Sequence, residues 1–282
     1  MGGSAGPVTK TFATLLELPG PDSEKTDRQF VTALARGLEV LRAFEPQDGP
    51  LGNQELAERT RLPKPTVSRI THTLTKLGYL EYVPRLSKYR IGLGVLALGH
   101  ACIGGAALRS AARPHMQRLA AYADATVALG GRDRLSMIYL EVCRGAHTAA
   151  FSLEAGARVP IHRSAMGYAY LWALPVAERE LLLKAICKRS GGEWPTVKKQ
   201  LDAAFKALER TGFCVAEGIY ERSINGVGAA LVLQNGTEVH ALSCSGPAFQ
   251  LAVRHLQDEI GPRLLAMLAA IREDVSRQTR DF

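Results

Sequence analysis

Apolar side chains recur with a helical period near the start of the chain. In residues 30–45 they lie three or four positions apart, at Leu34, Leu38, Leu41 and Phe44. This spacing predicts an amphipathic helix, and we expect these side chains to serve the core of their own domain. A second helix of under three turns is predicted at 53–60, where Asn53 offers an N-cap.

A third helix is predicted from Lys64 to Gly78. Pro65 fits its first turn, where the missing N–H group would have no partner, and glycine is a common stop signal. The apolar face of this helix comprises Val67, Ile70, Leu74 and Leu77. Two β-rich runs follow, GYLEYV and KYRIGL, and residues 84–87 between them have the composition of a hairpin turn. Three helices and a hairpin over residues 29–93 predict a winged helix-turn-helix.

The outward face of the third helix carries short hydroxyl groups and cations, which match the base edges and phosphates of a DNA major groove. A solvated helix face is the ordinary alternative. The charge favours DNA, because seven Lys or Arg accompany one acid, Glu81, between Arg61 and Ile91, in a chain of net charge +8. The predicted contacts on the helix are Lys64, Thr66, Ser68, Arg69, His72, Thr73 and Lys76. In the hairpin, Arg85, Lys88 and Arg90 are predicted to contact phosphates or the minor groove.

From Gly94 to Thr126 the chain becomes small and apolar, with one expected break at Pro114. We predict a linker helix over residues 94–112 and a second domain over residues 113–282. The glycine pair at 104–105 weakens the linker helix, so a hinge and a close helix contact fit equally well.

Strand-like and helix-like runs are mixed in the second domain. TVALGG, LSMIYLEV, TAAFSL, NGVGAALVL and EVHALSCS are typical of strands. AMGYAYLWAL, VAERELLLKAIC and TVKKQLDAAFKALERTG are typical of helices, and a last helix is predicted at 253–277. The segment QNGT at 234–237 is a strong hairpin signal. The predicted fold class is α+β, with an antiparallel sheet covered by helices.

The composition indicates which class of protein and which cellular compartment to expect. With 46% apolar residues in a chain of 282, a sizeable core is expected, and no run of about 18 apolar residues predicts a membrane span. Residues 1–28 lack the pattern of a secretory signal and are predicted to form a mobile arm. The five cysteines form no CxxC pair, which argues for a reducing compartment, so we expect the protein in the cytoplasm.

Three features resemble parts of enzyme sites, and none has its required context. The run from Gly226 to Ala230 lacks the third glycine of a dinucleotide fingerprint and lies in a predicted strand. The segment SCSG at 243–246 has no GxSxG elbow around it. The seven histidines form no HExxH pair, so no metal site and no cofactor are predicted.

Several segments together resemble the IclR family of bacterial transcriptional regulators, over about residues 30–275. They are ELAERTRLPKPTVSRITHTLTKLGYLEY, KYRIGLGVLALG, ARPHMQRLA, VPIHRSAMGYAYLWALP, ERTGFCVAEG and ALSCSGPAFQL. The resemblance implies a winged helix-turn-helix, a linker helix and a GAF-like effector-binding domain, in homodimers that often pair into tetramers. Arg61, Pro65, Arg163 and Gly226 depart from the residues usual in the family at their positions.

The resemblance also implies an effector site, at Ala165, Met166, Ala216, Ile224, Gly226, Ser243 and Ser245. Because Ser243 and Ser245 are two positions apart on a strand, both hydroxyls can face one cavity while Cys244 faces away. Ser164 can cap the following helix, whose first N–H groups favour an anion. These donors beside Met166 and Ile224 predict a small carboxylate with an apolar body, with Arg163 as a candidate counter-ion. Alternatively, the serines bond only to neighbouring backbone and side chains fill the space.

The sequence therefore favours a ligand-responsive transcription factor that binds a double-stranded operator as a dimer or tetramer, with repression and activation both open. The alternative is a small-molecule enzyme domain tethered to a DNA-binding module. It is disfavoured because no nucleophile and base are assembled in the sequence.

Overall fold

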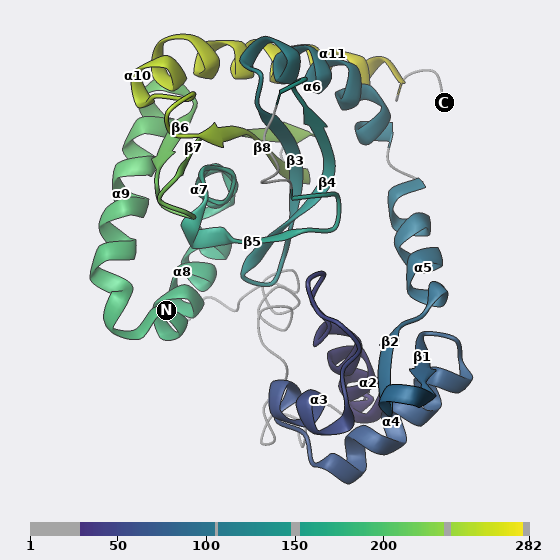
Figure 1. Ribbon diagram of the computed structural model, residues 1–282. Helices are drawn as coiled ribbons and strands as arrows, with labels where there is room; N and C mark the ends of the chain where they lie inside the picture. The colour runs from purple at the N-terminus through teal and green to yellow at the C-terminus, as the bar shows by residue number, and fades with distance from the viewer. Residues whose placement is uncertain (1–28, 105–106, 148–152, 234–237, 279–282) are drawn as a thin grey trace. The chain divides into compact units, whose positions relative to one another are not determined.

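The computed structural model describes residues 29–104, 107–147, 153–233 and 238–278 (Figure 1). They form two compact units, one ending at Gly104 and the other beginning at Ala107. The predicted arm at 1–28, the second glycine of the 104–105 pair, most of the TAAFSL run and the QNGT turn lie outside the described residues.

The first unit contains three helices followed by a hairpin and a fourth helix. The helices are α2 (Thr32–Arg42), α3 (Asn53–Thr60), α4 (Lys64–Lys76) and α5 (Leu93–Gly104). The strands β1 (Leu80–Val83) and β2 (Lys88–Ile91) pair antiparallel around a 3-10 turn, Pro84–Leu86. A small core holds them together, formed by Val40, Leu51, Leu56, Val67, Leu74 and Leu80. The predicted winged helix-turn-helix fold is confirmed.

The predicted Asn53 cap of α3 is wrong. Gly52, and not Asn53, caps α3, and its N–H donates to the Glu55 carboxylate at 2.6 Å. The Asn53 carboxamide instead accepts a hydrogen bond from the buried Thr71 hydroxyl at 3.0 Å. A side-chain cap was expected from residue type alone, but the backbone N–H of glycine and a carboxylate three positions later satisfy the same helix end.

The apolar stripe of residues 30–45 reaches the core only in part, because Leu41 and Phe44 pack against it and the other two leucines do not. Leu34 and Leu38 are 62% and 50% exposed, and Leu77 at the end of α4 is 63% exposed, while Val40 and Thr71 are buried. A hydrophobic period locates an apolar face, but it does not say whether the same chain covers that face.

The second unit is built on a six-stranded antiparallel sheet in the order β5-β4-β3-β8-β7-β6. Its strands are β3 (Thr126–Asp133), β4 (Ser136–Arg144), β5 (Arg158–Pro160), β6 (Cys214–Glu217), β7 (Ile224–Leu233) and β8 (Glu238–Pro247). The short strands β5 and β6 lie at the two edges, and the sequence pattern did not predict them. The predicted pairing of the long strands β7 and β8 is confirmed.

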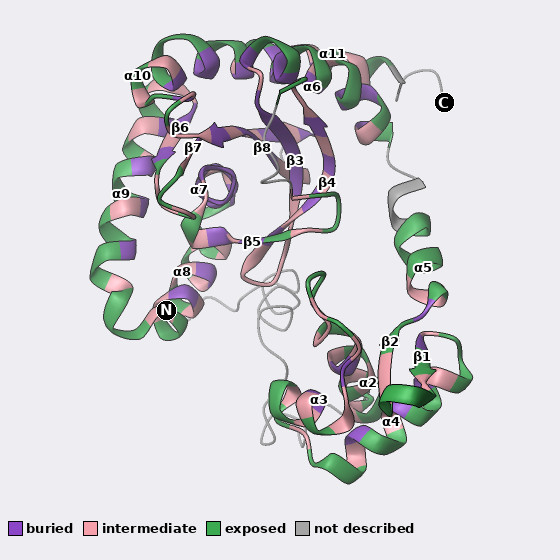
Figure 2. Cartoon of the chain, viewed as in Figure 1, coloured by how far each residue is buried: buried purple, intermediate pink, exposed green. Residues whose placement is uncertain are grey.

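Helices cover both faces of this sheet (Figure 1). On one face α6 (Ala107–Ala123) packs beside α11 (Gly261–Gln278), which follows a short α10 (Val253–His255) and a π-helical turn at Leu256–Ile260. The other face holds α7 (Ala165–Ala173), α8 (Val176–Ser190) and α9 (Trp194–Thr211). Figure 2 shows that α7 is buried along its length.

The expected break at Pro114 is wrong, because this proline lies inside α6. The neighbouring Leu108, Ala112 and Met116 are buried against the sheet, and this packing retains the helix despite the lost N–H group. Residues 94–112 therefore span most of α5 and the first turns of α6. No described helix is long and apolar enough to cross a membrane.

Candidate functional site

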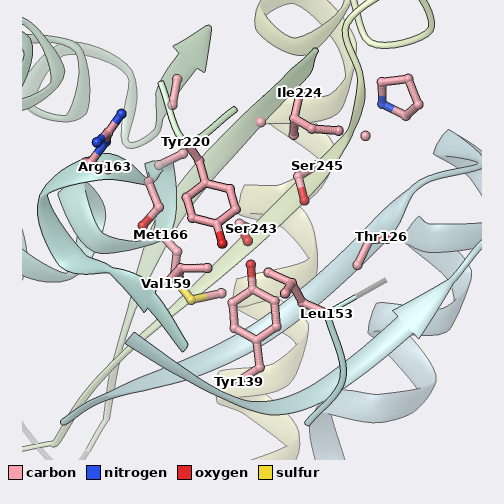
Figure 3. Close-up of a pocket in the computed structure, with 16 residues that line it drawn as sticks. Thr126, Tyr139, Leu153, Val159, Arg163, Met166, Tyr220, Ile224, Ser243 and Ser245 are labelled. Carbon is pink, nitrogen blue, oxygen red and sulfur yellow. The ribbon is translucent and has the colours of Figure 1, made fainter. Parts of the chain in front are cut away.

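A cavity lies between the sheet of the second unit and the start of α7 (Figure 3). The volume that the centre of a water-sized sphere can occupy in this cavity is about 90 Å³. One water needs roughly 10–15 Å³ by the same measure, so the cavity has room for several waters. All eight residues predicted for an effector site line this cavity: Arg163, Ala165, Met166, Ala216, Ile224, Gly226, Ser243 and Ser245. The structure thus brings together residues that are up to 82 positions apart, counted from Arg163 to Ser245.

The alternation of side chains along β8 decides which way the two serines face. On β8, Ser243 and Ser245 line the cavity, while Cys244 is buried in the core on the opposite face. Ser245 is paired with Thr126 of β3 and Gly226 of β7, which also line the cavity. Directly opposed residues in an antiparallel sheet share a face, so the cavity floor extends across three strands.

One close backbone approach and one helix cap shape the cavity around the start of α7. A Cβ atom at Gly228 would overlap the carbonyl of Ala165, so glycine lets the helix start sit directly on β7. Ser164 is the N-cap of α7, and its hydroxyl accepts a hydrogen bond from the Gly167 N–H at 3.1 Å. The predicted cap is confirmed, and the first N–H groups of α7 lie at the cavity wall.

Within the described residues, the hydroxyls of Ser243 and Ser245 make no hydrogen bond to the protein. Arg163 is exposed and lies apart from the other labelled side chains in Figure 3. The cavity therefore contains neutral hydroxyl donors at its floor and a cation only at its rim.

Two tyrosines complete the cavity. Tyr139 of β4 is 7% exposed, and Tyr220 in the β6–β7 connection is 39% exposed. Figure 3 shows both hydroxyl groups pointing toward the middle of the cavity. Burial, and secondarily the neighbouring Tyr220, raises the pKa of Tyr139 to about 12, so its phenol stays protonated at physiological pH.

A β-bulge decides which way Tyr139 faces. Leu129 of β3 pairs with Glu141, but the next residue, Gly130, pairs with Tyr139, so Leu140 is the extra residue. Tyr139 consequently faces α7, while the buried Glu141 faces α6 and accepts hydrogen bonds from Arg109 and Arg113. The cavity strand and the first turns of α6 are thus held together by a buried ion pair network.

The polar face of α4 is exposed as predicted from its period. Ser68, Arg69, His72, Thr73, Lys76 and Lys64 are exposed, and Thr66 is half-buried. Val67, Thr71 and Leu74 on the opposite side are buried. Arg69, Thr66 and Thr73 also border a groove that α4 forms with α2 and the exposed leucines.

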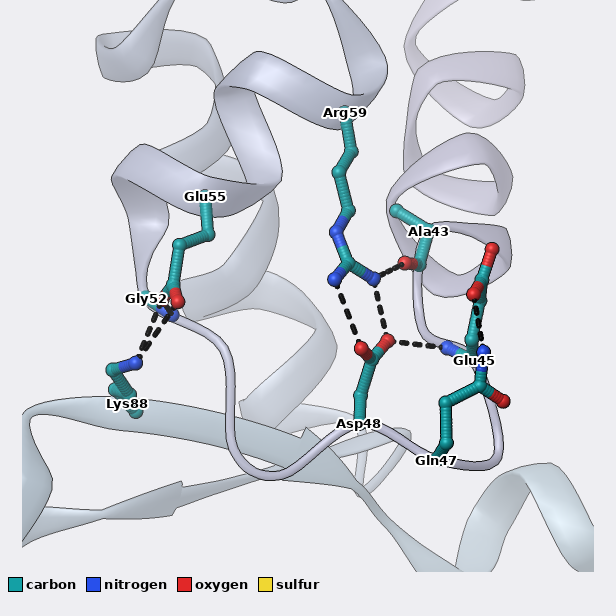
Figure 4. A network of polar contacts seen from close by, with 8 residues as sticks. All are labelled: Ala43, Glu45, Gln47, Asp48, Gly52, Glu55, Arg59 and Lys88. Atoms are coloured by element: carbon teal, nitrogen blue, oxygen red, sulfur yellow. Dashed lines mark hydrogen bonds and ion pairs between the residues drawn. The ribbon is translucent and has the colours of Figure 1, made fainter.

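Two of the three hairpin cations predicted to contact DNA pair with carboxylates, and Figure 4 shows the Lys88 pair. The Lys88 ammonium lies 2.9 Å from the Glu55 carboxylate, which also accepts from the Gly52 N–H. Arg90 pairs with Glu81 at 2.7 Å. In the part of the chain that the structure describes, Arg85 has no ion-pair partner. Lys88 and Arg90 would therefore have to leave a carboxylate to contact phosphate, and their predicted DNA contacts stay predictions.

Two family models match the chain. The IclR helix-turn-helix domain matches residues 33–84, and the bacterial transcriptional regulator IclR C-terminal domain matches residues 100–277. The chain belongs to the IclR family. It is a ligand-responsive, DNA-binding transcriptional regulator.

Relatives agree with this assignment. The HTH-type transcriptional regulator TsaQ1/TsaQ2 of Comamonas testosteroni is 36% identical over 258 residues, covering 90% of this chain and 92% of that protein. The crystal structure of an IclR family regulator from Brucella abortus is 46% identical and superposes with a TM-score of 0.83, covering 92% and 97% of the two chains. An IclR homolog from Microbacterium hydrocarbonoxydans, complexed with 4-hydroxybenzoate, shares the fold at 24% identity and a TM-score of 0.68, covering 87% and 100%.

In this IclR-family regulator, sequence reasoning missed Tyr139, Tyr220 and the Glu141 network. A tyrosine inside the apolar run LSMIYLEV was a usable signal, because a buried phenol ordinarily needs a partner. Its direction was not visible, since no residue type marks the bulge at Leu140. Among the described residues, no group of three or more His, Cys, Asp or Glu could hold a metal ion.

Proposed function

We propose that this regulator senses a small organic acid in the cavity between β8 and α7, and that occupancy changes its affinity for an operator. The observation that carries the proposal is the pair of serine hydroxyls, Ser243 and Ser245, which face the cavity without a hydrogen-bond partner among the described residues. This disfavours the alternative in which both serines only satisfy neighbouring backbone.

A carboxylate fits the donors around it. An ionised carboxylate accepts hydrogen bonds and donates none, so it complements hydroxyl groups and the N–H groups at the start of α7. Met166, Ile224 and Val159 supply an apolar wall for the body of the acid. Arg163 at the rim is the proposed counter-ion that attracts the anion.

On the DNA side, we place α4 in the major groove, where Arg69, His72 and Lys76 project furthest from the buried stripe. One such helix reads a half-site, so the active form is a homodimer, or a tetramer of two dimers. The exposed Leu34 and Leu38 of α2 and Leu98 of α5 line one apolar groove and are proposed to meet a second copy. Acting on chromosomal DNA, the protein works in the cytoplasm.

The acid site is tested by calorimetry with a panel of small carboxylates that includes 4-hydroxybenzoate. The Ser243→Ala, Ser245→Ala double variant should bind the best acid of the panel at least tenfold more weakly than the parent. Equal affinity of parent and variant would place the site elsewhere. The acid should also be recovered unchanged after prolonged incubation, because a sensor releases its ligand whereas an enzyme consumes it.

Self-association is tested separately. Sedimentation of the parent at micromolar concentration should show a dimer or a larger assembly, and the Leu38→Glu, Leu98→Glu variant should shift it toward monomer. The exposed Val176→Glu variant on α8 is the matched control and should leave the assembly unchanged. A monomeric parent, with and without operator DNA, would contradict the dimer.

A further inference from the structure

Two phenol groups face the cavity in addition to the serines. Tyr139 comes from β4 and Tyr220 from the β6–β7 connection, and their hydroxyls point toward the same space in Figure 3. Neither hydroxyl has a hydrogen-bond partner among the described residues. Tyr139 lies almost wholly out of solvent, at 7% exposure.

A ligand that fills the cavity displaces the water from these hydroxyls, and a hydroxyl that it leaves without a partner then costs free energy. The serine hydroxyls and the N–H groups of the first turn of α7 already supply donors for a carboxylate. An acid whose body is entirely apolar would therefore leave the largely buried Tyr139 hydroxyl unpaired once it fills the cavity. An acid with a second polar group would pair it.

We propose that Tyr139 and Tyr220 are specificity-determining contacts that select acids carrying a second, uncharged hydrogen-bonding group, such as a hydroxyl or a keto oxygen. This rests on the proposed function, in which the cavity holds an organic acid. A phenol both donates and accepts, so it pairs with either group.

The second polar group of the acid is expected to be uncharged because the cavity lining is almost entirely neutral. Among its described lining residues Arg163 alone is charged, and that side chain is exposed at the rim. A second carboxylate would be placed beside neutral side chains, without a cation to offset its loss of water. Dicarboxylates are therefore expected to bind more weakly than hydroxy acids of the same size.

A structural role for the Tyr139 hydroxyl predicts something different. If the hydroxyl served the fold, its removal would lower stability, but it makes no hydrogen bond that its removal could break. Tyr139→Phe should therefore leave the melting temperature of the ligand-free protein unchanged or slightly raised. Tyr168→Phe is the matched control, because the Tyr168 hydroxyl also has no partner among the described residues but is buried and does not line the cavity.

The experiment uses calorimetry on the full-length protein with three matched pairs of acids: glycolate and acetate, 3-hydroxybutyrate and butyrate, 4-hydroxybenzoate and benzoate. The parent should bind the hydroxylated member of at least one pair about tenfold more tightly, the factor expected when a buried hydroxyl gains a partner. In the Tyr139→Phe, Tyr220→Phe variant this preference should fall below threefold, while affinity for the unsubstituted acid changes little. Tyr168→Phe should keep the parent's preference.

The outcomes separate this inference from the proposed function. Equal affinity for both members of every pair, or a preference that survives both Tyr→Phe substitutions, overturns the inference while leaving the acid site in place. Unchanged affinity in the Ser243→Ala, Ser245→Ala variant overturns the acid site at the serines. A parent that binds none of the six acids overturns both.

Discussion

In the cavity of the second unit, the hydroxyls of Ser243, Ser245 and Tyr139 have no partner among the described residues, whereas in the hairpin of the first unit Lys88 and Arg90 already pair with carboxylates. The first arrangement becomes costly when a ligand displaces the water of the cavity without pairing these hydroxyls. The second costs little, because exposed ion pairs are screened and easily exchanged for phosphate. Unpaired groups inside a cavity thus indicate a ligand more strongly than cations on a surface indicate DNA.

The buried counterpart of the hairpin ion pairs is Glu141, which holds Arg109 and Arg113 against β4. Glu141→Ala should lower the free energy of unfolding by about 3 kcal/mol, near the low end for a buried pair because both arginines reach solvent. Chemical denaturation of the full-length protein measures the loss. The exposed pair offers the control, since Glu81→Ala should leave the midpoint almost unchanged. A loss equal to that of Glu81→Ala would show that the buried network does not support the fold.

On α4, Arg69→Ala should weaken operator binding by about 2 kcal/mol if the side chain reads a base edge. The loss should depend on the operator sequence, because a base contact specifies and a phosphate contact only positions. Band-shift titrations against operator variants measure it. The control is Lys206→Ala on α9, an exposed cation of the second unit. A uniform loss on every DNA sequence would reassign Arg69 to the phosphate backbone.

Features of the two sites that depend on neighbouring residues could be predicted from the sequence, and features that depend on distant residues could not. The shared face of Ser243 and Ser245 follows from strand periodicity over three residues, so the sequence alone located it. Glu55 lies 33 positions from Lys88, and no local pattern connects them. The direction of Tyr139 depends on a bulge at Leu140, and the exposure of Leu34 depends on what covers α2. Local periods predict faces, but pairings across the chain decide what those faces contact.

The hairpin allows a cation that is unpaired among the described residues, Arg85, to be compared with a paired one, Lys88. Arg85→Ala should reduce the slope of log affinity against log salt by about one, the value for one lost phosphate contact. Lys88→Ala should reduce it by less, since the Lys88 ammonium lies 2.9 Å from Glu55 and must leave that partner to reach phosphate. Titrations of operator DNA at several salt concentrations give both slopes. Equal slopes for the two variants would mean that the Glu55 pair does not restrain Lys88.

The smallest expected effect is the loss of stability at low pH that comes from the polar network in the first unit (Figure 4). The Arg59 hydrogen bond holds the pKa of Asp48 below its ordinary 3.8, and the Gly52 N–H, followed by Lys88, holds the pKa of Glu55 below 4.5. Because both folded values lie below the unfolded ones, the network contributes fully above about pH 5 and loses its contribution as pH falls through the folded values.

Thermal unfolding of the parent and of an Asp48→Asn, Glu55→Gln variant from pH 7 to pH 3 isolates this response. The melting temperature of the parent should fall more steeply below pH 4.5 than that of the variant, so the difference between them narrows with acid. Salt should reduce the difference at pH 7, because Arg59 and Lys88 are partly exposed. Parallel curves for the two proteins would show that these carboxylates have the same pKa values in the folded and unfolded chains. The network would then stabilise α3 through side-chain packing rather than through charge.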